Sequence, residues 1–151
     1  ITDAMFAAGA EGVAEFEIER VRGAMSPNRR YLCVVGKPNT LFGSVLTTDV
    51  GFCNVVNWLT VDHAGIWTET HSAMPLDRAV LLAGRCASRN PARVLGLLEP
   101  GRAGRGLSDC LGSLDPGKRA DVVVMALHGV PGRFSPEVRH VLVGGREIGP
   151  P

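Results

Sequence analysis

Apolar positions recur with two different periods along this chain, and the change of period divides it into segments. Residues 17–21 and 30–35 alternate apolar and polar side chains on either side of Ser26-Pro27-Asn28, which is typical of strands in a hairpin. From Thr48 onward the apolar positions recur every three or four residues, which predicts a helix. The buried face predicted for that helix comprises Phe52, Val55, Val56, Leu59 and His63.

Two further helices are predicted from the same period. The first covers residues 75–88, with Pro75 at the first helical position and Asp77 in the first turn, where a carboxylate favours the helix dipole. The second is short and follows at once, with Asn90 as its N-cap and Pro91 as its first residue. Both helices place apolar side chains along one face, so we expect them to pack against a core.

The end of the chain returns to strand patterns. Residues 120–125 and 137–143 are apolar runs that predict strands, and Gly144-Gly145 is typical of a tight turn after the second one. Asp115-Pro116-Gly117-Lys118 fits a type II turn, with proline and glycine at the two central positions. Because these strands follow the helices and do not alternate with them, we predict a small sheet packed beside the helical part.

Composition narrows the function classes. The chain has 151 residues, of which 45% are hydrophobic and 21% charged, as in one globular domain with an apolar core. Its net charge of +1 gives no indication of binding to nucleic acid or to a membrane surface. No apolar run reaches the ~20 residues that span a bilayer. The four cysteines form no CxxC pair, and we interpret them as small buried side chains in a reducing compartment.

One carboxylate is a candidate for chemistry. Ile1 and Thr2 precede Asp3, and a small-residue run follows from Ala7 to Ala10. A barrel strand that ends in a carboxylate at the mouth of the barrel has this pattern, and (β/α)₈ enzymes carry their chemistry at the C-terminal ends of the strands. This pattern predicts the last part of a larger enzyme that begins near a catalytic residue, although an aspartate at the end of a strand, such as Asp3, can also be a helix or loop cap.

Two other polar segments have simpler interpretations. Asp62-His63 and Glu69-Thr70-His71 bring histidines near carboxylates, but Gly65 stands between them. Their spacing matches no pair of metal-binding histidines on a helix, so we interpret the segment as a surface insertion. Residues 99–109 are rich in glycine and arginine without periodicity, and we interpret them as a solvated loop.

Several motifs together resemble a known family. Asn90-Pro91-Ala92-Arg93-Val94, Gly112-Ser113-Leu114-Asp115-Pro116-Gly117-Lys118 and Val141-Leu142-Val143-Gly144-Gly145 resemble the C-terminal signature of the amidohydrolase superfamily. Ile1-Thr2-Asp3-Ala4-Met5 resembles the catalytic-aspartate strand of the N-acetylglucosamine-6-phosphate deacetylases within it. Residues 40–47, Thr-Leu-Phe-Gly-Ser-Val-Leu-Thr, resemble the substrate-contacting turn of these deacetylases, with Phe42 in place of the usual small residue.

The resemblance implies a fold and a division of the chain. The fold class is α/β: the C-terminal part of a (β/α)₈ TIM barrel, with its last strand and helices, together with strands of a small β-sandwich. Residues 1–111 would belong to the barrel, with a β excursion at 15–40 and helices over about 48–98. Residues 112–151 would supply the sandwich strands.

The resemblance also implies an activity. The expected reaction is hydrolysis of the N-acetyl group of N-acetylglucosamine 6-phosphate to glucosamine 6-phosphate and acetate. Asp3 would shuttle the proton, and Leu41, Phe42 and Gly43 would contact the sugar. The divalent metal, zinc or similar, would be bound by residues upstream of this chain, so the chain alone is expected to be inactive. We expect a cytoplasmic homodimer, with the remainder of the barrel as a further partner.

Two alternatives stay open. The C-terminal motifs would also fit another amidohydrolase, such as a deaminase or a cyclic amidase, although the segment at residues 40–47 argues against it. The other alternative is a non-catalytic or truncated relative that serves as a packing or partner module. Glutamate and histidine ligands on an upstream segment would discriminate between an enzyme and such a relative.

Overall fold

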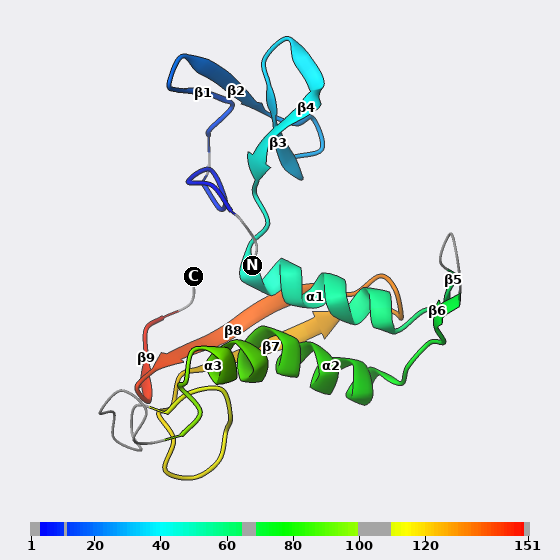
Figure 1. Cartoon of the computed structure of the whole chain (residues 1–151), viewed down its shortest axis with the longest axis vertical. Helices are drawn as coiled ribbons and strands as arrows, with labels where there is room; N and C mark the ends of the chain where they lie inside the picture. Colours follow the sequence, from blue (N-terminus) through cyan, green and yellow to red (C-terminus); the bar gives the residue numbers. More distant parts are fainter. Residues whose placement is uncertain (1–3, 11, 65–68, 100–109, 150–151) are drawn as a thin grey trace. The chain divides into compact units, whose positions relative to one another are not determined.

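The chain divides into two compact units, Ile1–Gly51 and Phe52–Pro151. The structure is a computed structural model that describes residues 4–10, 12–64, 69–99 and 110–149. The described residues form mixed α/β structure with antiparallel sheets, which confirms the predicted class at that level (Figure 1). The boundary expected at residue 111 belongs to the barrel assignment and stays a prediction.

The first unit is built on a four-stranded antiparallel sheet. Its strands follow one another in the order β1-β2-β3-β4 (Figure 1). Their bounds are Glu15–Ile18 for β1, Val21–Met25 for β2, Tyr31–Val34 for β3 and Lys37–Ser44 for β4. Each strand therefore pairs with its neighbour in the chain, and short turns are sufficient to connect them.

One predicted strand of this unit is wrong in its bounds. Glu19 and Arg20 form the turn between β1 and β2, with φ angles of 49° and 67°, so residues 17–21 belong to two strands. Hairpin turns of this left-handed kind favour asparagine and glycine. Two charged residues carry no such signal, and the alternation of side chains continues through them.

Aromatic side chains cover one part of the first unit. Phe16 makes edge-to-face contacts with Phe6 and Phe42, at ring-centre distances of 5.1 Å and 5.0 Å. A Cβ at Gly23 would overlap the Phe16 ring, so glycine lets that ring lie against β2. Edge-to-face pairs contribute about 0.5–1.5 kcal/mol beyond the burial of their area. The cluster thus joins residues that are far apart in the sequence.

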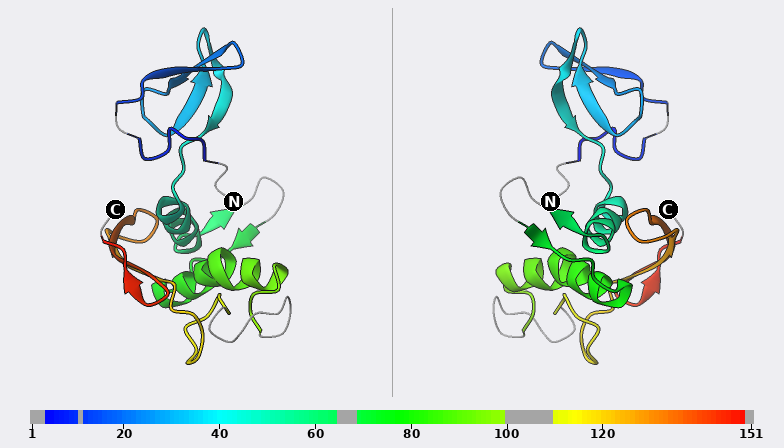
Figure 2. Two further views of the ribbon diagram at one scale, coloured as in Figure 1. Left: turned by 90° about the vertical axis from the view of Figure 1, so that its left-hand side faces the viewer. Right: turned by 90° about the vertical axis from the view of Figure 1, so that its right-hand side faces the viewer.

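The second unit combines helices with two small antiparallel sheets, β5-β6 and β7-β8-β9. Its helical elements are α1 (Thr48–Leu59, which begins at the end of the first unit), α2 (Leu76–Gly84), the π-helical turn η1 (Arg85–Arg89) and α3 (Asn90–Val94). Its strands are β5 (His63–Ala64), β6 (Glu69–His71), β7 (Val122–His128), β8 (Ser135–Val143) and β9 (Arg146–Glu147). In Figure 2, α1 and α2 lie on the same face of the β7–β8 pair.

The core of the second unit lies between the two long helices and the sheet. Val56 and Leu59 of α1 pack against Ala79 and Ala83 of α2, and partly buried apolar side chains, including Leu127 of β7, close the cluster. The alanines let the helices approach closely, because small side chains leave room for those of the partner helix. The helical period therefore identified Val56 and Leu59 correctly as buried, whereas Val55, which was predicted for the same face, is exposed.

Three local predictions in the second unit are wrong. His63 does not lie on the face of α1, because that helix ends at Leu59 and His63 begins β5. Asn90 is not an N-cap: its φ and ψ are −67° and −46°, and η1 connects α2 to α3 without a break. Cys86 is exposed, whereas Cys53 and Cys110 are buried as expected.

The C-terminal sheet agrees with its prediction. Both expected strands are present as β7 and β8, which pair in antiparallel register. Gly144 and Gly145 form the turn before β9, with φ angles of 58° and 78°. The Asp121 carboxylate holds that turn by accepting the N–H of Gly144 at 2.7 Å. No helix within the described ranges is long and apolar enough to cross a membrane.

The Asn57 side chain connects α1 to the segment between β7 and β8. Its Nδ2 donates to the Phe134 carbonyl at 2.8 Å, and its Oδ1 accepts the Phe134 N–H at 2.6 Å. Asn57→Ala removes both bonds and leaves a partly buried N–H, so we expect a loss of about 1–3 kcal/mol in the free energy of unfolding. Urea unfolding followed by circular dichroism measures it.

Asn54 provides the control for this prediction. It is exposed on the same helix, so Asn54→Ala should change the free energy of unfolding by no more than about 0.5 kcal/mol. Equal losses in the two variants would show that the amide contact with Phe134 does not stabilise this unit.

Candidate functional site

The segment that follows Asp3 lies beside the end of β4. Asp3 itself is outside the described residues, but Ala4 forms a parallel bridge with Ser44. The Met5 N–H donates to the Ser44 carbonyl at 2.9 Å. The structure thereby brings the neighbours of Asp3 next to the strand that carries Leu41, Phe42 and Gly43.

Leu41, Phe42 and Gly43 belong to β4, so the expected turn is wrong at these positions. Gly43 pairs with Leu32 and Leu41 pairs with Cys33, which leaves Phe42 as the extra residue of a β-bulge. Bulges occur next to active sites, where they change the direction of a side chain. Here the bulge sends the Phe42 ring against Phe16, and the Leu41 side chain is 70% exposed.

Gly43 has a local structural reason to be glycine. A Cβ at this position would overlap the Met5 side chain, which lies over β4 where the two segments run in parallel. Glycine also allows a ligand to approach the backbone closely. Glycine at position 43 therefore has two candidate causes, the Met5 contact and a substrate contact. The two causes predict different kcat values when Gly43→Ala is combined with Met5→Ala.

Ser44 does not cap α1. Its hydroxyl accepts the N–H of Leu46 at 3.0 Å, and α1 begins only at Thr48. This local turn bends the chain directly after the bulge.

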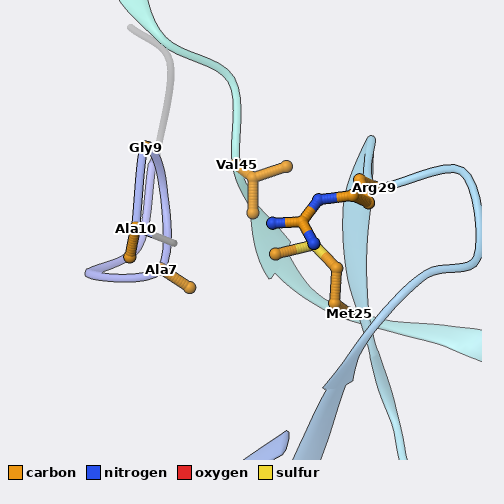
Figure 3. A pocket seen from close by; sticks show the side chains of 6 residues that line it. All are labelled: Ala7, Gly9, Ala10, Met25, Arg29 and Val45. Carbon is orange, nitrogen blue, oxygen red and sulfur yellow. The ribbon is translucent and has the colours of Figure 1, made fainter. Parts of the chain in front are cut away.

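A cavity of about 250 Å³ adjoins these segments within the first unit. Its lining residues are Ala7, Gly9, Ala10, Met25, Arg29 and Val45. Figure 3 shows the Arg29 guanidinium between Met25 and Val45. Arg29 has a φ of 55°, an unusual backbone conformation for a side chain of this size. Arginine recognises carboxylates and phosphates, so the polar side of this cavity suits an anionic group.

The metal ligands that the family resemblance implies would lie upstream of this chain. Within the ranges that the structure describes, no three histidine, cysteine, aspartate or glutamate side chains are grouped to hold a metal ion. His128 and His140 instead contact Glu137 and Glu147 on the C-terminal sheet, at 2.6 Å each.

Sequence reasoning missed Met5, Arg29 and the bulge at Phe42. The Met5 contact and the bulge depend on strand register, which a single sequence does not carry. Arg29 directly follows the Ser26-Pro27-Asn28 turn motif, and this position in a turn is the signal in the sequence that could have pointed to it.

Comparison with known proteins found no matching family model, no matching curated protein and no matching solved structure.

Proposed function

We propose that this chain is the C-terminal portion of a metal-dependent deacetylase that acts on N-acetylglucosamine 6-phosphate. The observation that carries the proposal is the Ala4–Ser44 bridge. The segments on either side of this bridge are those that resemble the catalytic-aspartate strand and the substrate-contacting segment of the family. They lie far apart in the sequence, yet a functional site requires them to be neighbours.

Amide hydrolysis assigns a role to Asp3. A water must lose a proton to attack the acetyl carbonyl, and the amine must gain one to leave. A carboxylate within reach of both can take the first proton and deliver the second. The divalent metal of the family would act as a Lewis acid and would be held by polypeptide outside this chain. The backbone of Leu41, Phe42 and Gly43 would hold the sugar in place.

The proposed fold is the last β/α unit of a TIM barrel with strands of a small β-sandwich, the latter contributed by β7, β8 and β9. Apolar side chains on the helical segment of the second unit support the expectation that further polypeptide packs there. These exposed side chains are Leu76, Val80, Leu81, Val94 and Leu95. Exposed apolar area of this kind is typical of a contact surface. We further propose a cytoplasmic homodimer, on the resemblance alone.

The proposal is tested by acetate release from N-acetylglucosamine 6-phosphate. The protein is the longest polypeptide that contains this chain, supplied with a divalent metal, and we expect turnover. N-acetylglucosamine without the phosphate is the matched control substrate and should react more slowly at equal concentration. Folded, metal-loaded protein without turnover would contradict the proposal and favour a deaminase, a cyclic amidase or a non-catalytic relative.

A further inference from the structure

Two histidines meet across the β5–β6 hairpin of the second unit. His63 and His71 are register partners in the antiparallel pair, and their ring centres are 5.3 Å apart. Two imidazoles that bind one cation through metal–nitrogen bonds of about 2.0 Å have ring centres about 4.5–5 Å apart, for angles from the right angle of tetragonal sites to the tetrahedral angle. The separation in this hairpin is therefore suited to a shared cation.

The hydrogen bond of His71 leaves its ring nitrogen Nε2 without a proton, which is the form that binds a metal. Its Nδ1 lies 3.0 Å from the Ser72 carbonyl, and a carbonyl can only accept, so Nδ1 carries the proton. In the neutral ring Nε2 then has the lone pair. This Nε2 is withdrawn from solvent and has no hydrogen-bond partner among the described residues. A buried polar atom of this kind calls for an explanation, and a bound water or ion is one.

We propose that His63 and His71 form a binding site for a late transition-metal cation, with Cu²⁺ bound most tightly and water completing the coordination. Imidazole is a good ligand for copper, nickel and zinc, and copper binds most strongly in this series. A carbonyl that accepts from the opposite ring nitrogen, as Ser72 does, orients a ligating histidine. This proposal does not rest on the proposed deacetylase activity.

Trp58 provides a built-in reporter for this site. Its ring centre lies 4.6 Å from that of His71 and 5.4 Å from that of His63. A paramagnetic Cu²⁺ ion held by both histidines would quench the fluorescence of Trp58 at this range. The test protein is the 151-residue chain with Trp67→Phe, which leaves one tryptophan, and with Cys86→Ser, which removes the exposed thiol.

The experiment is a Cu²⁺ titration of this protein followed by tryptophan fluorescence. His71→Phe and His63→Phe each keep an aromatic ring beside Trp58 but remove a ligand. We expect each to weaken binding by at least about tenfold, since even the loss of an outer-shell partner weakens metal sites by 10–100-fold. His140→Phe removes a histidine from the C-terminal sheet and should leave the affinity unchanged. Circular dichroism checks that the variants fold alike.

Electron paramagnetic resonance of the Cu²⁺ complex supplies the second readout. The parent should show hyperfine structure from two nitrogen ligands, and His71→Phe should show one. Equal affinities in His71→Phe and His140→Phe, or a single nitrogen ligand in the parent, would overturn the proposal.

Discussion

Replacing Asp3 with asparagine is expected to lower kcat for acetate release by about 10²–10⁴-fold, which is the contribution of a general acid–base group. Asparagine keeps the shape of the side chain but cannot accept the proton of the attacking water. Folding and substrate binding should change little, so KM should stay close to its original value. Initial rates across substrate concentrations, measured on the longest polypeptide containing this chain, separate the two constants.

A second aspartate gives this experiment its control. Asp77 lies in the first turn of α2, where its charge favours the helix dipole. Asp77→Asn removes a carboxylate from a helix of the second unit, and kcat should be unchanged. If Asp3→Asn retained full kcat in protein that turns over substrate, Asp3 would not be the proton shuttle, whatever the substrate.

The sequence was sufficient to predict the elements whose signals are local. The apolar runs at residues 120–125 and 137–143 predicted β7 and β8, and Gly144-Gly145 predicted the turn that follows. The helical period placed Val56 and Leu59 in the core. In each case the decisive signal is a side-chain period or a turn residue within a short window.

Features that depend on long-range pairing could not be predicted. The contact of Met5 with Gly43 follows from a parallel bridge between distant segments, and no residue type in either segment specifies that register. The pairing of His63 with His71 follows likewise from the register of a hairpin. Their spacing along the chain therefore suggested only a surface insertion. The candidate functional site and the histidine pair therefore both depend on such pairings.

Gly43→Ala is expected to lower kcat by up to about 100-fold, because a displacement of about 1 Å in a catalytic geometry can cost that much. The new Cβ would overlap the Met5 side chain and displace the segment that directly follows Asp3. Since a methionine side chain is flexible, it can turn aside, so the melting temperature should fall only slightly. Steady-state kinetics and a thermal melt on the same sample measure both effects.

Gly84→Ala is the matched control, because a Cβ there meets open space, and it should leave kcat unchanged. The informative variant is the double substitution Gly43→Ala with Met5→Ala. If the overlap with Met5 displaces Asp3, truncating Met5 removes the overlap and restores most of kcat, a coupling that a double-mutant cycle quantifies. If the double variant stays as slow as Gly43→Ala, the Met5 explanation is wrong. Glycine would then be required by the substrate, whose approach to the β4 backbone the added methyl group would block.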